Sequence, residues 1–206
     1  LEDPWKCPDE SMWLRTKSIE KSSNKADILE LEFKSGDITK INKKTLSPAK
    51  ILDKLNMLAG KHGIGRVDIV ENRYVGIKSR GCYETPGGTI YHKAHKAIES
   101  ITLDRELLHL KEDLSNRYTR LVYNGYWFSP ERNSLQKLID DSQKKVSGVV
   151  KIKLFKGNVI VLGRKSPYSL YSEDLSTFEA DSGDYNQRDA EGFIKVNSLR
   201  LRNKQK

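Results

Sequence analysis

The sequence predicts an α+β fold in which antiparallel β-hairpins lie around a helical middle, with a short helix near the C-terminus. Two observations support this prediction. Strand-like runs occur as adjacent pairs joined by glycine-containing turns, before and after the middle of the chain. Between those pairs, apolar residues recur at helical spacing over long segments. Because the strands do not alternate regularly with helices, an antiparallel sheet is favoured over a doubly wound parallel sheet.

The first part of the chain is polar and irregular and contains Pro4 and Pro8. We expect residues 1–25 to form an arm between domains. Trp5 and Trp13 lie in this segment, and the simpler interpretation is a linker in which both rings are covered. The alternative is that the two rings anchor the arm against another surface.

A first hairpin is predicted directly after the arm. Leu29, Leu31 and Phe33 alternate with charged residues, which is typical of a strand with one buried and one solvated face. The residues Ser35-Gly36-Asp37 favour a turn, and a second apolar strand follows at 38–41.

The helical middle shows recognisable start and stop signals. Ser47 followed by Pro48 is typical of an N-cap with proline in the first helical position, and Ser129 repeats that pattern before Pro130. Asp104 is also a good N-cap residue. The predicted helical segments are 48–60, 90–98, 104–125 and 129–139.

The chain returns to strands after the helices. A second hairpin is predicted over 148–162, with its turn at 156–158 and lysines on its outer face. Further on, a short amphipathic helix with a basic end is predicted over 190–201, where the apolar residues are Phe193, Ile194, Leu199 and Leu201.

The segment 63–89 differs from the rest because glycine, arginine, glutamate and tyrosine interrupt its short apolar runs. Val67–Val70 and Tyr74–Ile77 are predicted to be the two strands of a hairpin. Residues 78–81 would follow the hairpin, with a glycine that permits close backbone approach, and residues 85–88 would form a turn. A stretch with this many long polar side chains and flexible glycines is typical of a binding site.

Glu71 and Tyr83 flank this passage and are the candidate binding residues. A carboxylate can hold an ammonium group, and a phenol can donate or accept a hydrogen bond. Together they suit an amino-acid ligand. Lys78 and Arg80 either contribute to the same site or are solvated charges in a turn.

Composition limits the remaining possibilities. The chain has 206 residues, is 36% hydrophobic and carries a formal net charge of +9. No run approaches the roughly twenty apolar residues of a membrane span, and no signal-peptide pattern opens the sequence, so a soluble cytoplasmic protein is expected. Nucleic-acid binding is not expected, because the basic residues are interspersed with acids and no aromatic stacking motif accompanies them.

Neither a metal site nor a nucleophilic catalytic residue is predicted. Cys7 and Cys82 are far apart in the sequence and outside any C-x-x-C pattern, so both are expected to be free thiols. His92 and His95 are three residues apart without a third ligand nearby, which is typical of histidines on a helix surface.

Several blocks of the chain resemble argininosuccinate synthases. The longest block is G-R-V-D-I-V-E-N-R-Y-V-G-I-K-S-R-G-C-Y-E-T-P-G-G-T, which begins at Gly65. The others are L-A-G-K-H-G, T-L-D-R-E, L-V-Y-N-G-Y-W-F-S-P, G-R-K-S-P-Y-S-L-Y and D-A-E-G-F-I-K-V-N-S-L-R-L-R. They occur in the order found in that family, so the resemblance extends over essentially the whole chain.

The resemblance implies an ATP-dependent ligase of arginine biosynthesis that joins citrulline to aspartate and releases AMP and pyrophosphate. It also implies that Glu71 and Tyr83 bind citrulline, and that binding and alignment matter more than acid–base catalysis. Cys82, where relatives commonly carry an aliphatic residue, is expected to be a tolerated small apolar substitution.

The resemblance further implies that this chain is a carboxyl-terminal part. The family's phosphate-binding string S-G-G-x-D-T-S does not occur in the sequence, and Leu1 lies in what resembles the family's L-E-D-P-W segment. ATP, with magnesium, and aspartate would then be bound mainly by an amino-terminal domain, and the chain alone would be inactive. A homotetramer is implied, with a citrulline-side synthetase domain at 26–185 and an oligomerisation tail at 186–206.

Two other functions stay open at this point. The chain could be purely a structural and oligomerisation module, with the chemistry in the other half of the protein. It could also be an unrelated basic RNA-binding domain, which would bind RNA in a salt-sensitive way without any effect of citrulline.

Overall fold

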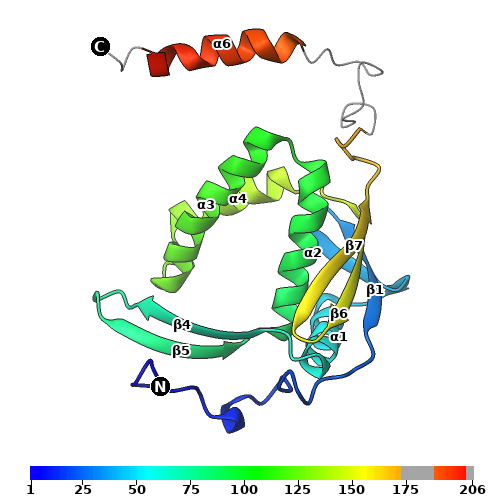
Figure 1. Ribbon diagram of the computed structural model, residues 1–206, viewed down its shortest axis with the longest axis vertical. Coiled ribbons are helices and arrows are strands. Elements are labelled where there is room, and N and C mark those ends of the chain that lie inside the picture. Colours follow the sequence, from blue (N-terminus) through cyan, green and yellow to red (C-terminus); the bar gives the residue numbers. More distant parts are fainter. Residues whose placement is uncertain (173–187, 203–206) are drawn as a thin grey trace. The chain divides into compact units, whose positions relative to one another are not determined.

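The computed structural model describes residues 1–172 and 188–202 (Figure 1). It confirms the predicted α+β class, because antiparallel hairpins lie around a helical middle and a short helix lies near the C-terminus. The chain divides into two compact units, 1–169 and 170–206, and each is described by itself. The domain boundaries predicted after residues 25 and 185 stay predictions.

The main sheet consists of β1 (Asp27–Lys34), β2 (Asp37–Ile41), β3 (Lys44–Thr45), β6 (Gly148–Phe155) and β7 (Asn158–Lys165). Its order is β3-β2-β1-β6-β7, and all neighbours are antiparallel. Both hairpins predicted at the two ends of the body are therefore confirmed. The pairing of β1 with β6, in which Leu31 lies opposite Val150, joins them into one sheet.

Two helices, α1 (Pro48–Lys61) and α2 (Pro86–Thr102), cover one face of this sheet (Figure 1). The core between them is apolar, and its fully buried members include Leu31, Ile41, Leu55, Ile90, Ile98, Ile152 and Leu154. On the other face of β1, Ile28 is 52% exposed. This arrangement confirms the prediction of a hairpin with one solvated face.

Helices α3 (Arg105–Tyr123) and α4 (Pro130–Ser142) complete the helical middle. Their predicted caps are confirmed. The carboxylate of Asp104 accepts hydrogen bonds from the backbone N–H groups of Glu106 and Leu107, and the hydroxyl of Ser129 accepts one from the N–H of Arg132. These caps satisfy N–H groups that would otherwise have no partner in the first turn of a helix.

The turn predicted at 85–88 is wrong, because Pro86 begins α2. Proline is well suited to the first helical position, where its missing N–H costs nothing. The N–H of Gly87 donates to Oδ1 of Asn56 at 2.8 Å, and a Cβ on Gly87 would lie 2.7 Å from the same oxygen. The glycine therefore allows α2 to pack closely on α1.

A separate two-stranded sheet lies between α1 and α2 in the sequence, formed by β4 (Arg66–Asn72) and β5 (Lys78–Glu84). The predicted hairpin is present, but the second strand predicted at Tyr74–Ile77 is wrong. These residues form the connecting turn, in which Gly76 has a φ of 84° and its N–H donates to the backbone oxygen of Arg73. The β-branched residues near the tip suggested a strand although they are exposed.

The arm at the start of the chain is irregular, as predicted, apart from one turn of 3-10 helix, η1 (Glu10–Met12). It runs beside the β4–β5 hairpin (Figure 1). Arg66 of β4 binds the carboxylate of Glu10 at 2.7 and 2.8 Å, and its guanidinium carbon lies 4.9 Å from the ring centroid of Trp13. Trp5 is 94% exposed, so the predicted linker with two covered rings is wrong for this residue.

The carboxylate of Glu84, at the end of β5, binds backbone groups of the arm. It accepts hydrogen bonds from the N–H groups of Leu14, Arg15 and Thr16 at 2.7 to 3.0 Å, and from the hydroxyl of Thr16 at 2.6 Å. Burial disfavours the charged carboxylate, but these hydrogen bonds outweigh that effect and lower the pKa of Glu84.

The short C-terminal helix is α6 (Arg188–Arg202). Its apolar residues are exposed, and the most exposed of them are Phe193 at 69% and Val196 at 68%. The prediction of a short amphipathic helix here is confirmed. Residues 173–187 and 203–206 lie outside the described part of the chain.

The first prediction concerns the sheet core. Leu31→Ala removes a fully buried side chain from the central strand and should lower the free energy of unfolding by about 2 to 5 kcal/mol. Ile28→Ala, on the exposed face of the same strand, should cost less than about 1 kcal/mol. Urea denaturation followed by circular dichroism measures both. Equal losses in the two variants would contradict the assignment of the buried face.

The second prediction concerns Glu84. Because its pKa is lower in the folded state than its ordinary value, its contribution is complete above that ordinary value and is lost as the pH falls through the lowered pKa. At about pH 7, Glu84→Gln should lower the free energy of unfolding by about 1 to 3 kcal/mol, and the difference should shrink as the pH falls below the ordinary pKa of a glutamate.

Urea denaturation of the wild type and the variant at several pH values tests this. Glu112→Gln, which changes an exposed carboxylate on α3, is the matched control and should show little difference at any of these pH values. A difference between wild type and Glu84→Gln that does not vary with pH would contradict the role given to the carboxylate charge.

Candidate functional site

The β4–β5 hairpin presents different side chains on its two faces. Successive residues of a strand point to opposite sides, and residues opposite each other on paired strands share a side. The pairs Val67–Tyr83, Ile69–Gly81 and Glu71–Ser79 therefore lie on one face. The pairs Asp68–Cys82 and Val70–Arg80 lie on the other.

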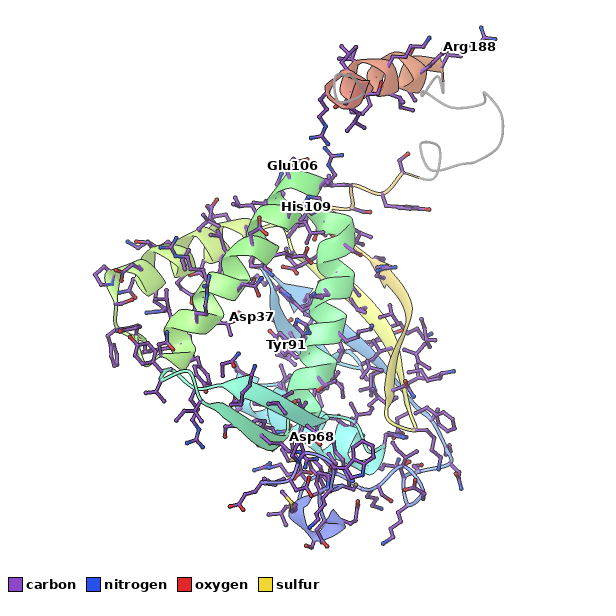
Figure 2. All side chains as sticks on the ribbon, turned by 60° about the vertical axis from the view of Figure 1, so that its left-hand side comes forward. Asp37, Asp68, Tyr91, Glu106, His109 and Arg188 are labelled. Atoms are coloured by element: carbon purple, nitrogen blue, oxygen red, sulfur yellow. The ribbon has the colours of Figure 1, made fainter. Side chains whose placement is uncertain are left out.

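The face that carries Asp68 and Arg80 binds the arm. Arg80 donates to both carboxylate oxygens of Asp68, from Nε at 2.9 Å and Nη2 at 2.6 Å. Its Nη1 also donates to the backbone oxygens of Asp3 and Lys6. The structure therefore places Arg80 in the attachment of the arm, and its alternative interpretation as a solvated turn charge is wrong. Figure 2 shows Asp68 on the hairpin, close to the arm.

The opposite face brings together the two residues predicted as a binding pair. The phenol of Tyr83 donates to Oε1 of Glu71 at 3.2 Å, although the two residues lie on different strands. This hydrogen bond and the charge of the Glu71 carboxylate raise the pKa of Tyr83. The phenol is therefore a proton donor near neutral pH, and the bond occupies only one of the two carboxylate oxygens.

Neighbouring side chains extend this polar face. Arg73 donates from Nη2 to the hydroxyl of Ser79 at 3.0 Å. Tyr123, at the end of α3, lies close enough to Tyr83 to add a small increase to its pKa. Tyr83 itself is 45% exposed, so its ring can meet a ligand from solvent.

Cys82 lies opposite Asp68, on the face that binds the arm, and is a free thiol, as predicted. Partial burial, followed by the negative charge of Asp68, raises the pKa of Cys82. A raised pKa keeps the thiol protonated and disfavours nucleophilic chemistry. Cys7 is also free and is exposed.

A second polar region was not predicted. A cavity of about 810 Å³ lies between α2, α3, α4 and the β1–β2 turn, and its lining includes Asp37, Tyr91, His95, Lys111 and Gln143. The phenol of Tyr91 donates to Oδ1 of Asp37 at 3.1 Å, and Figure 2 shows these two residues near each other. The sequence signal for this region was the row of polar residues on one side of α2.

His95 corrects one expectation. It is not a helix-surface histidine, because only 17% of its side chain is exposed, whereas His92 is exposed as predicted. Its Nε2 lies 2.9 Å from Oε1 of Gln143, and Nδ1 lies 3.5 Å from the buried carboxylate of Glu99. Burial lowers the pKa of His95 although Glu99 acts in the opposite direction.

Glu99 is the most buried charge of this region, with 2% of its side chain exposed. Its carboxylate accepts hydrogen bonds from Lys111 and from Nε2 of Gln143, at 3.0 Å and 2.9 Å. A buried carboxylate is stable only when its oxygens are bonded in this way. Its partners therefore give this cluster a structural role, in holding α2, α3 and the end of α4 together.

In residues 1–172 and 188–202, no group of three or more histidine, cysteine, aspartate or glutamate side chains is arranged to hold a metal ion. Within the same ranges, no helix combines the length and the apolar character that crossing a membrane requires.

The Glu71–Tyr83 pair, which offers acceptor oxygens and a phenolic donor, suits binding of a cationic or amphoteric group.

Comparison with known proteins identifies the family. A family model described as the arginosuccinate synthase C-terminal domain matches residues 1–204. Curated relatives named argininosuccinate synthase include those of Nitrosococcus oceani, 63% identical over 203 residues, and Hahella chejuensis, 60% identical over 202 residues. The relative from Nitrosomonas europaea is 62% identical over 203 residues.

These alignments include 98% of this chain but 50% of each relative. The chain thus spans about half the length of the curated relatives that it matches. The match of the family model over nearly all of the sequence, together with this level of identity, shows that the chain belongs to the argininosuccinate synthase family and corresponds to its carboxyl-terminal domain.

Proposed function

We propose that this chain supplies the citrulline-binding side of an ATP-dependent ligase that joins citrulline and aspartate. The observation that carries the proposal is the contact between Tyr83 and Glu71 on the face of the hairpin that the arm leaves open. The family's citrulline-binding glutamate and tyrosine match these two positions, within V-E-N and R-G-C-Y-E-T-P.

The geometry suits the ammonium group of an amino acid. Oε1 of Glu71 accepts the hydrogen bond from Tyr83, and this bond restricts the rotation of the carboxylate. The carboxylate can then receive N–H donors of the ligand at its other oxygen, in a hydrogen bond strengthened by the two charges. Tyr83 keeps the Glu71 carboxylate in place, and its ring edge and phenol oxygen can contact the same ligand.

The proposed reaction uses ATP to activate citrulline. The ureido oxygen of citrulline bonds to the α-phosphorus of ATP and pyrophosphate leaves. The amine of aspartate then bonds to the ureido carbon, AMP leaves with that oxygen, and the amine loses a proton. Alignment of the reacting atoms supplies much of the rate in such a reaction, so Glu71 and Tyr83 serve to position the substrate.

ATP with magnesium, and aspartate, are proposed to be bound mainly by the amino-terminal half found in the family. The 206 residues alone would then bind citrulline weakly and would not form argininosuccinate. We also propose that the protein acts in the cytoplasm, in arginine biosynthesis, without nucleic acid. The span 26–185 would form the synthetase side and 1–25 the arm to the other domain.

A role in assembly is the second candidate function, and α6 favours it. The exposed residues Phe193, Ile194, Val196, Leu199 and Leu201 give this helix an apolar surface that would gain stability by burial. We propose that the tail, 186–206, contributes subunit contacts to a homotetramer. Burial between identical subunits is a common fate of such a surface.

The third prediction tests the citrulline pair in a full-length enzyme that carries this chain. Glu71→Gln removes the charge that pairs with the ammonium group and should weaken citrulline capture by about 1.5 to 3 kcal/mol. Tyr83→Phe removes the phenol hydroxyl but leaves the Glu71 carboxylate and its charge in place, and should cost less, about 0.5 to 1.5 kcal/mol. Steady-state kinetics with citrulline and ATP varied separately measures both.

Matched changes elsewhere give the controls. Glu112→Gln and Tyr168→Phe alter the same residue types at exposed positions and should leave citrulline and ATP kinetics unchanged. An unaltered KM for citrulline together with unaltered turnover in both Glu71→Gln and Tyr83→Phe would refute the assignment of the site. A rise in the KM for ATP alone would place these residues in another role.

The fourth prediction tests the tail. Deleting residues 190–206 from the same full-length enzyme removes most of α6 and should yield a species smaller than a tetramer, because the proposed subunit contacts are lost. Light scattering gives the mass, and circular dichroism shows whether the deletion folds. A folded deletion variant that stays tetrameric would show that the tail is not the assembly element.

A further inference from the structure

Gly81 lies in the middle of β5, where its backbone does not require glycine. It pairs with Ile69 in a regular antiparallel ladder. Its φ is outside the positive range that favours glycine, unlike that of Gly76 in the nearby turn. Glycine weakens a strand interior, and it is often found there because another group approaches the backbone closely. The reason for glycine at position 81 must therefore lie in the groups that surround it.

The side chain of Tyr83 occupies the space above Gly81. A Cβ built on Gly81 would lie 2.5 Å from both Cε2 and the phenol oxygen of Tyr83, and 2.6 Å from Cζ. Real Cβ atoms essentially never show such distances. The ring of Tyr83 therefore lies against the strand, directly over the Cα of Gly81.

This position is what brings the phenol to Glu71. Along the face they share, Tyr83 lies opposite Val67, Gly81 lies opposite Ile69, and Glu71 is one pair further along. The phenol must therefore extend past Gly81 to reach the carboxylate, at the 3.2 Å that the structure has. A side chain at position 81 would stand in that path.

We propose that Gly81 is a positioning residue for the citrulline site, because its missing side chain allows Tyr83 to lie along β5 and hold the carboxylate of Glu71. The inference rests on the function proposed above for Glu71 and Tyr83. It adds that the pair depends on a third residue, which has no side chain with which to touch the ligand.

A larger residue at position 81 should displace the tyrosine and leave the strand intact. The backbone at Gly81 suits any residue, and the strand is hydrogen-bonded to β4 along its whole length. The atoms that would collide belong to the free end of a side chain that is 45% exposed, so the ring can rotate into solvent. A substitution at position 81 should therefore move the side chain of Tyr83 without unfolding the hairpin.

The test compares Gly81→Ala with Gly163→Ala in a full-length enzyme that carries this chain. Gly163 also lies within a strand, β7, but nothing lies within 4 Å of the Cβ that alanine would add. Gly81→Ala should raise the KM for citrulline about tenfold, the loss of roughly one hydrogen bond to a charged group, without changing the KM for ATP. Gly163→Ala should change neither KM, and neither variant should have a lowered Tm.

A double-mutant comparison identifies the collision partner. In a Tyr83→Ala background, the ring that meets the new methyl group is absent. Gly81→Ala should therefore add no further change to the KM for citrulline in that background. An equal tenfold effect with and without Tyr83 would overturn the proposal, because Gly81 would then act on the site in another way.

A spectroscopic measurement separates this inference from the proposed function. With 3-fluorotyrosine at position 83, fluorine NMR follows the titration of the phenol, whose pKa the hydrogen bond to Glu71 raises. Gly81→Ala should lower that pKa toward the value of an exposed tyrosine, whether or not citrulline binds there. An unchanged titration together with an unchanged KM for citrulline would overturn the inference.

The two hypotheses therefore fail differently. If Glu71→Gln and Tyr83→Phe leave citrulline kinetics unchanged while Gly81→Ala shifts the phenol titration, the proposed function is wrong and Gly81 positions a pair that serves no citrulline site. If the first two variants weaken citrulline capture and Gly81→Ala changes neither kinetics nor titration, the proposed function stands and the role of Gly81 is wrong.

Discussion

The alternation of side chains along the β4–β5 hairpin is the constraint on which the candidate site depends. One face is attached to the arm by Arg80, which donates to the backbone oxygens of Asp3 and Lys6 while it pairs with Asp68, and the strand end is attached by Glu84. Because those contacts engage one face, the residues between them are directed to the other. A shift of one residue in the pairing of β4 with β5 would move Glu71 to the wrong side. The arm contacts therefore specify the pairing as well as adding stability.

The helical middle is held together in a different way. Glu99 is 2% exposed, and a charge so far from solvent is compatible with the fold only because Lys111 and Gln143 bond to it. These partners come from α3 and the end of α4, so the three segments have to be in place together. Such a network contributes little net stability compared with an apolar core, but it disfavours other packings of the same helices.

Much of this architecture could be predicted because local signals dominate it. Asp104 and Ser129 cap helices by bonds to residues two or three positions away, and such bonds are legible in the sequence. The misplaced elements depend on distant contacts. The start of α2 at Pro86 brings Gly87 against α1 in addition to suiting proline locally, and His95 is buried because the end of α4 covers it. The pair Glu71 and Tyr83 could be proposed from the family resemblance, but the space above Gly81 follows from register, which the sequence does not show.

The pairing of β1 with β6 also has a consequence for the order in which the chain folds. Leu31 and Val150 are neighbours in the sheet, but the ribosome adds Val150 to the chain long after Leu31. At typical rates of synthesis, the interval between them is on the order of ten seconds. During this interval the backbone groups along one side of β1 have no partner strand, and β1 is rich in apolar residues. An unpaired apolar strand edge of this kind favours pairing with other chains. Helix α1 emerges early enough to cover the apolar face, but it does not cover that edge. The nascent chain is therefore most prone to aggregation while its helices are being made, and that risk ends when β6 arrives.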